Sequence, residues 1–455
     1  MSTTKKSTAI ENIITVLAGA LLLGFLWRVR GTTGWGSSWG LLNAGFIFTM
    51  FIILVKGSRQ KWNIGWLALT ALSFMMTVPS WGTLLNQITG VLYKAEFWSV
   101  GDSNVYVSVA SAVFLMLCLG FGLATLFGIM LGRGFSSKQW KLKDFIIVVA
   151  AFYIADLISK ATISHLILNL IQPQAVEIFE EGLAAAGLDT NVYKIYLEHF
   201  NDLPWAKKFD GGRNYFSSIQ AISSVIRSAA ALLAVRFIVK DKTSAKTGFV
   251  VSAAFSFSIT ISDLFFYFGN GGYHMQRESY FTDFIYPWSC WEYFTGFIAG
   301  AIITAFMLKL KDEEDLPELA FQKVPTKIKT VLTFILGYAF MVGVSIVRPV
   351  LERFKDTDYQ IIFTVAAVIV AVAVVAILCI KWGENAQKIS ITKFAAVMLP
   401  TFIAYVFASY MFIASPDRQE FRDINNLHTI LCIVSVAATL VWAVVNGRKK
   451  LKSDK

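Results

Sequence analysis

The sequence is poor in the residues on which disulfide-stabilised and metal-binding proteins depend. Its 455 residues include four cysteines, four histidines and nine prolines, and only 16% of them are charged. The cysteines (Cys118, Cys290, Cys379 and Cys432) lie far apart, each inside an apolar run. Their spacing therefore predicts neither a disulfide framework nor a metal site. No Asn-x-Ser/Thr sequon is present either, which favours a bacterial source.

Long apolar runs are the feature that the sequence has in abundance. Hydrophobic residues make up 56% of the chain, phenylalanine alone occurs 38 times, and the mean hydropathy is +0.59. About a dozen runs of roughly 18–25 residues recur from end to end, each long enough to cross a bilayer as a helix. We therefore expect an all-α, polytopic integral membrane helical bundle.

The runs predict about twelve transmembrane helices. They cover residues 10–27, 41–55, 64–80, 105–131, 145–171, 217–239, 249–268, 284–308, 329–346, 359–380, 391–413 and 427–445. Every second connection is rich in lysine and arginine, and the alternate connections are more acidic. Because basic loops remain in the cytoplasm, both termini are expected to be cytoplasmic. The net charge of +11 is thus a topology signal and does not indicate nucleic-acid binding.

Loop composition predicts the domain organisation. Residues 1–308 are expected to form an eight-helix membrane core with an extracellular helical cap at 172–216, where Gly187 is a plausible helix end. An acidic, proline-containing stretch at 309–327 is typical of a cytoplasmic linker. Residues 328–447 are expected to form a four-helix bundle, followed by a basic cytoplasmic tail at 448–455.

Ionisable residues inside membrane helices are costly and therefore mark functional candidates. Four consecutive predicted helices, 145–171 to 284–308, hold almost all of them. Asp156 and Lys160 are four residues apart, in the favourable order for a pair on one helical face. The pair is either structural or exchanges partners with Arg227 or Glu292 during function. The predicted coupling or acid/base residues are Asp156, Lys160, His165, Asp263 and Glu292, although a lone histidine is more often structural.

Two predicted outer loops combine arginine, tryptophan and glycine. Arginine forks bind carboxylates or phosphates, and tryptophan stacks on sugar rings, while glycine permits close backbone approach. The alternative is an ordinary turn within an interfacial aromatic belt. The predicted substrate-binding residues come from these loops and, for one arginine, from the membrane interior. They are Arg28, Arg30, Trp35, Trp39, Arg227, Asn270, His274, Arg277 and Trp288.

These patterns favour a secondary transporter or permease for a small anionic or sugar-containing solute, with an outward-opening Arg/Trp-lined cavity over buried carboxylates. An intramembrane enzyme, a transferase or hydrolase acting at the outer face on a lipid-linked or glycan substrate, is the alternative. A scaffold subunit is a third possibility. The expected location is the cell membrane, specifically a bacterial inner membrane. The expected partners are the bilayer and the substrate, with no nucleic acid, cofactor or metal.

Overall fold

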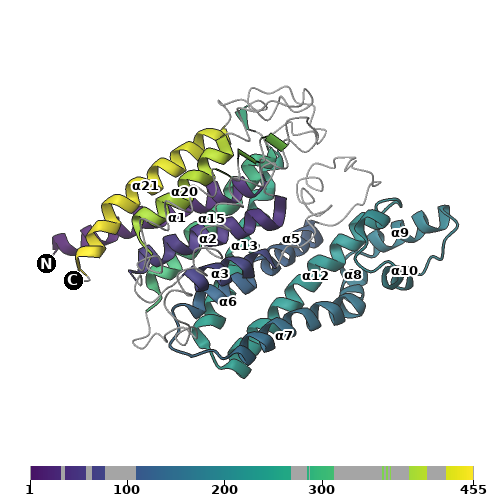
Figure 1. The fold of residues 1–455 in the computed structure, drawn as a ribbon. Coiled ribbons are helices and arrows are strands. Elements are labelled where there is room, and N and C mark those ends of the chain that lie inside the picture. The colour runs from purple at the N-terminus through teal and green to yellow at the C-terminus, as the bar shows by residue number, and fades with distance from the viewer. Residues whose placement is uncertain are drawn as a thin grey trace. The chain divides into compact units, whose positions relative to one another are not determined.

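The fold is all-helical in a computed structural model of the chain (Figure 1). The structure describes residues 2–31, 36–57, 64–76, 109–267, 284–285, 287–311, 361–362, 365–366, 369, 389–406 and 427–453. Within these residues there is no β-strand, as the apolar composition predicts.

Among the described residues, six helices are long and apolar enough to cross a membrane. They cover Ala9–Gly31, Ala110–Arg133, Gly212–Val239, Lys242–Phe265, Ser289–Lys309 and Leu427–Asn446. A seventh candidate is bent by 54° between Leu142–Ala161 and Ile163–Ile171. Two shorter apolar helices, Gly40–Lys56 and Ile391–Ile403, coincide with further predicted spans. Predicted spans 329–346 and most of 359–380 lie outside the described residues.

The described helices group into two compact units. The first comprises Met1–Met76, Met130–Gln139 and Glu292–Lys455. The second comprises Thr77–Ile129 and Trp140–Trp291. The expected linker at 309–327 is described only as far as residue 311, and much of the expected bundle at 328–447 lies outside the described residues. That division into domains therefore stays a prediction.

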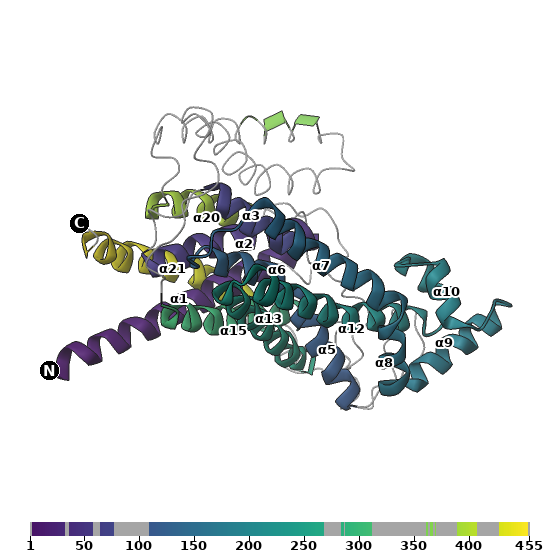
Figure 2. The ribbon, with the colours of Figure 1, turned by 90° about the horizontal axis from the view of Figure 1, so that it is seen from below.

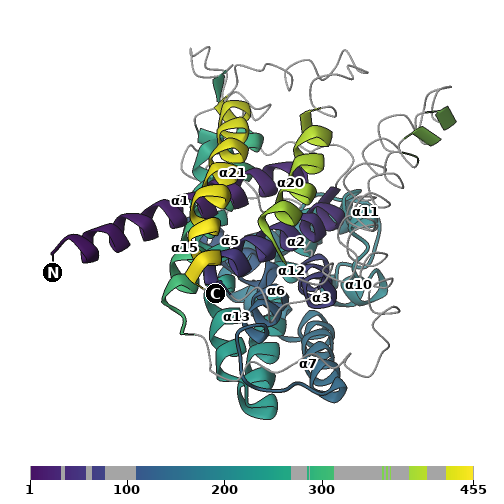
Figure 3. The ribbon, with the colours of Figure 1, turned by 60° about the vertical axis from the view of Figure 1, so that its left-hand side comes forward.

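The first unit is built around helix α1 (Ser2–Gly31), which packs against α2 (Gly36–Lys56) and α21 (Leu427–Ser453). Helix α2 also contacts α3 (Ile64–Met75) and α20 (Ile391–Val406), and α20 lies beside α21 (Figure 3). Helix α15 (Pro287–Lys309) approaches α1 closely at Gly296 and Gly300, where an added Cβ would meet the α1 backbone. Small residues allow such close contact between membrane helices.

The second unit pairs α12 (Gly212–Leu233) with α7 (Leu142–Ala161) and with α5 (Val109–Leu123). Helix α5 continues through α6 (Thr125–Arg133), and α13 (Lys242–Ser262) packs on α5. A π-helix, η2 (Ala234–Val239), ends α12, and a 3₁₀ turn, η3 (Asp263–Tyr267), follows α13. Figure 2 shows α7 and α12 leading to α8 (Ile163–Ile171) and to the helices after it.

Between α8 and α12 the chain forms a small helical cap. It consists of α9 (Pro173–Ala185), α10 (Val192–Glu198) and a third, short helix, α11 (Leu203–Ala206), which the sequence pattern had not indicated. Gly187 adopts a φ of +70° directly after α9, which is the conformation that glycine favours at a helix end. The Asn191 side chain accepts a hydrogen bond from Lys194 N and thereby caps α10. Hydrogen bonds from the Lys194 ammonium and from a backbone N–H lower the pKa of the exposed Asp189.

Candidate functional site

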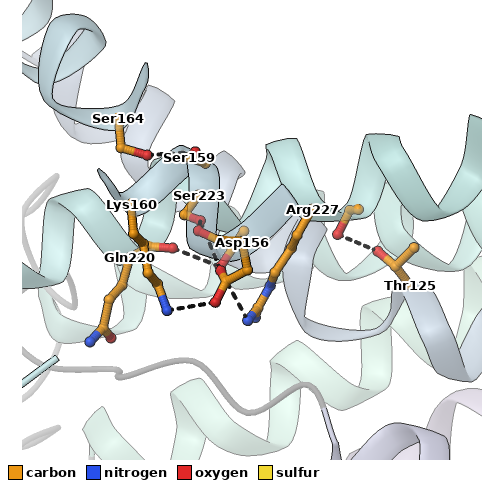
Figure 4. Close-up of polar contacts among 10 residues, drawn as sticks. Thr125, Asp156, Ser159, Lys160, Ser164, Gln220, Ser223 and Arg227 are labelled. Carbon is orange, nitrogen blue, oxygen red and sulfur yellow. Dashed lines mark hydrogen bonds and ion pairs between the residues drawn. The ribbon is translucent and has the colours of Figure 1, made fainter. Parts of the chain in front are cut away.

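The first candidate site is a buried charge cluster between α7 and α12. The Lys160 ammonium donates to Asp156 Oδ2 at 2.7 Å, and the Arg227 guanidinium lies 3.5 Å from Asp156 Oδ1. The Ser223 hydroxyl donates to the same Oδ1 at 2.8 Å (Figure 4). The three charged side chains are only 14%, 11% and 8% exposed, in the order Asp156, Lys160, Arg227. The predicted Asp156–Lys160 pair is therefore present, and Arg227 joins it.

Aromatic packing and hydrogen bonding hold this cluster in place. The Arg227 guanidinium lies 4.7 Å from the centre of the Phe152 ring, so it also makes a cation–π contact. Since Phe152 and Asp156 are one helical turn apart on α7, one face of that helix supplies both contacts. Two cations share one carboxylate here, and removing that carboxylate would leave like charges together in a region that water reaches poorly.

Buried hydroxyl groups continue beyond Arg227 along α12. The hydroxyl of Thr125 in α6 lies 2.8 Å from that of Ser228 and 2.7 Å from that of Ser252 in α13. Figure 4 shows Thr125 on the far side of Arg227 from Lys160. These three side chains are fully buried. Polar groups therefore extend from the charge cluster into the middle of the helix bundle.

His165 stabilises the break between α7 and α8. Its Nε2 atom lies 2.8 Å from the Lys160 carbonyl oxygen, and its Nδ1 atom lies 2.6 Å from the Tyr215 hydroxyl. Because a carbonyl oxygen only accepts, Nε2 donates to it, and Nδ1 of the neutral ring accepts from Tyr215. The Tyr193 hydroxyl donates to the carbonyl of Ala161 at 2.8 Å. Side chains thus satisfy the carbonyl groups that the broken helix exposes.

A second charge cluster joins the end of α1 to the first turns of α15. The Arg28 guanidinium donates to Glu292 Oε2 at 2.9 Å, and that of Arg30 donates to Oε1 at 3.2 Å. The Arg30 guanidinium also lies 4.8 Å from the centre of the Trp27 ring. All three charged side chains are nearly buried, at 10%, 6% and 12% exposure for Arg28, Arg30 and Glu292. Each oxygen of the one carboxylate therefore holds a different arginine.

Two glycines make room for this second cluster. An added Cβ at Gly31 would collide with the Glu292 carboxylate, and one at Gly40 would press on the backbone of Arg30. Gly31 and Gly40 thus lack a side chain because the Glu292 carboxylate and the Arg30 backbone lie too close to leave room for one. The arginines also lie in the last turn of α1, where the helix dipole favours positive charge.

The other predicted site residues are placed as follows. Asp263 is fully buried where α13 gives way to η3. Trp39 belongs to helix α2 and Trp288 to helix α15, and the structure describes only the backbone of these two residues. Trp35, Asn270, His274 and Arg277 lie outside the described residues, so their predicted binding roles stay predictions.

Sequence reasoning did not single out Ser223, Tyr215 or Thr125. Ser223 supports Asp156, Tyr215 supports His165, and Thr125 joins the hydroxyls of α12 and α13. Serine and threonine are so common in membrane helices that no single one stands out in the sequence.

The fold and the two clusters define an all-helical protein with the apolar helices of a multi-pass membrane protein and paired charges within them. No protein-family model, curated protein or solved structure matches the chain. What the clusters can do chemically follows from their composition. Arginine forks bind anions, and a carboxylate that shares those forks can exchange with an incoming anion or take up a proton.

Proposed function

We propose that the protein is an integral membrane permease for a small anionic or sugar-containing solute. The observation that carries this proposal is the cluster in which Arg28 and Arg30 both bind Glu292. Its arginines are the donors expected for a carboxylate or phosphate, and its glutamate is the group that a substrate anion would displace. When Glu292 takes up a proton, both guanidinium groups turn from it to the substrate.

We further propose twelve spans with both termini in the cytoplasm of a bacterial inner membrane. The Trp442 indole donates to the Thr15 hydroxyl at 3.1 Å, which pairs the start of the α1 span with the C-terminal half of α21. The two chain ends thus leave the first unit at the same end (Figure 1), which supports an even number of crossings. Cysteine labelling tests the topology: Asp202→Cys in the cap should react with an impermeant reagent in intact cells, and Lys138→Cys only after lysis.

The permease proposal is tested by transport into liposomes and by comparing the medium of a deletion strain with that of its parent. A solute that the deletion strain accumulates outside is the candidate substrate. Glu292→Gln keeps the size of the side chain but removes its charge, and it should abolish uptake without unfolding the protein. Glu198→Gln, the same change at an exposed cap position with 51% side-chain exposure, is the matched control. Normal uptake by Glu292→Gln would dismiss the site.

An intramembrane enzyme acting on a lipid-linked or glycan substrate is the second candidate. It is favoured by the position of Arg28, Arg30 and Glu292, which lie at the end of one candidate span and the start of another. A site at one face suits catalysis there, whereas a permease needs a polar route to the opposite face. An altered envelope glycan or lipid in the deletion strain, with an unchanged medium, would favour the enzyme.

A further inference from the structure

Helix α7 carries a shallow apolar groove on the same face as the Asp156–Lys160 pair. The groove has a volume of about 350 Å³, and its lining residues are Phe145, Ile146, Val149, Ala150, Tyr153 and Ile154. Val149, Tyr153, Asp156 and Lys160 follow one another at intervals of four, three and four residues, so they form one stripe along the helix. An apolar groove therefore leads directly to a charged end.

The length of α7 from its basic start to Lys160 matches the thickness of the whole hydrocarbon core of a bilayer. Basic residues, Lys141 and Lys143, flank Leu142 at the start of α7. At 1.5 Å per residue, Lys160 lies about 27 Å further along the helix, close to the ~30 Å thickness of the hydrocarbon core. The groove residues lie between these two levels. A headgroup at Lys160 would thus place an acyl chain along the groove.

The charged end of the stripe offers hydrogen-bond donors. An ammonium group has three N–H donors, and among the described residues the Lys160 ammonium donates to Asp156 alone. Figure 4 shows the side chains of Lys160, Gln220 and Arg227 pointing to the same side of the α7–α12 pair. Lys160 and Arg227 are cationic and share the single carboxylate of Asp156, so this end carries one net positive charge. Charge complementarity therefore selects an anion at this end of an apolar groove.

We infer that the α7–α12 face binds an anionic phospholipid of the leaflet opposite the Lys141 end, with its phosphate at Lys160 and Arg227 and one acyl chain in the groove. The site lies in a different unit from Arg28, Arg30 and Glu292, so it holds or fails independently of the proposed transport. The chemistry recognised is a phosphate ester attached to a hydrocarbon chain.

The test uses the purified, delipidated full-length protein and measures lipid binding by native mass spectrometry, with thermal unfolding in parallel. The probes are phosphatidylglycerol, phosphatidylcholine with the same chains, and glycerol phosphate. We expect the wild type to retain phosphatidylglycerol roughly tenfold more tightly than phosphatidylcholine, the ratio that one charge-assisted contact of about 1.4 kcal/mol produces. Lys160→Gln should remove this preference.

A second variant tests the acyl chain without touching the charges. Ala150→Phe fills the groove and should weaken the binding of both lipids, whereas Leu170→Phe, at an 83% exposed position on α8, should not. Equal retention of the two lipids by the wild type would overturn the proposal. A second result would also overturn it: glycerol phosphate raises the unfolding temperature as much as the lipid does, and this rise is the same in Ala150→Phe. The site would then bind only a free anion.

Discussion

Removing the charge of Asp156 tests whether the α7–α12 cluster stabilises the fold. The variant Asp156→Asn keeps the side-chain volume and an oxygen that can accept from Ser223, so the charge is the main change. It leaves Lys160 and Arg227 facing each other at low exposure, 11% and 8%. Removing one member of such a buried pair costs about 3–5 kcal/mol. At about 2–4 °C per kcal/mol for a unit of this size, the Tm should fall by roughly 6–20 °C.

The assay heats the purified protein in a mild detergent and measures the remaining monodisperse fraction by size-exclusion chromatography. The matched control is Asp189→Asn, because Asp189 also accepts from a lysine at 2.8 Å but is 44% exposed. Exposed pairs contribute little, so no detectable shift in Tm is expected there. The double variant Asp156→Asn/Lys160→Gln should recover part of the loss, since only one cation then remains. A Tm of Asp156→Asn that equals the wild-type value would refute the reasoning.

Three further predictions concern the other contacts. Gly31→Ala pushes a methyl group into the Glu292 carboxylate, so uptake by reconstituted protein should fall to the level of Glu292→Gln; full activity would contradict the close approach. Tyr215→Phe leaves the acceptor nitrogen of His165 without its donor and should lower the free energy of unfolding by about 1–3 kcal/mol, measured by denaturant titration. For Asp189 the pKa lies below its ordinary 3.8, so its contribution to the α9–α10 turn is complete at neutral pH and is lost as the pH falls through that lowered value. The carboxyl ¹³C shift of a labelled sample should show a midpoint below 3.8, and a midpoint at or above 3.8 would contradict the hydrogen bonds.

Local sequence signals predicted the features that depend on neighbouring residues. The four-residue spacing of Asp156 and Lys160 predicted their ion pair, because that spacing puts two side chains on one helical face. In the predicted cap, the apolar residues Val176, Phe179 and Leu183 have helical spacing in the sequence, and all three are buried on one face of α9. In both cases one or two helical turns contain all the information needed.

Two features of the structure were not predictable from local patterns. Glu292 lies more than 260 residues from Arg28 and Arg30 along the chain. No spacing rule connects such distant positions. Their pairing depends on how α1 packs against α15.

The second feature is the 54° break after Ala161, inside an apolar run that we predicted as one helix. Its cause is a set of hydroxyl side chains. Thr162 donates to the carbonyl of Ile158, and the hydroxyls of Ser159 and Ser164 bond to each other at 2.8 Å. Such bonds compete with the backbone ladder of the helix. Three hydroxyl residues within six positions were the available signal, but hydropathy alone does not register them.

The geometry of the α1–α15 cluster also predicts how transport would couple to protons. Each Glu292 oxygen holds one arginine, so a single protonation weakens both contacts at once. An anion that binds both guanidinium groups competes with the same carboxylate and favours its protonated form. Linkage is reciprocal, so the proton must also favour anion binding by the same factor. One proton should therefore accompany each anion, uptake should rise as the outside pH falls, and Glu292→Gln should retain at most a pH-independent exchange. Proton-to-anion flux measured in liposomes decides the matter, and pH-dependent cotransport by Glu292→Gln would place the coupling group elsewhere.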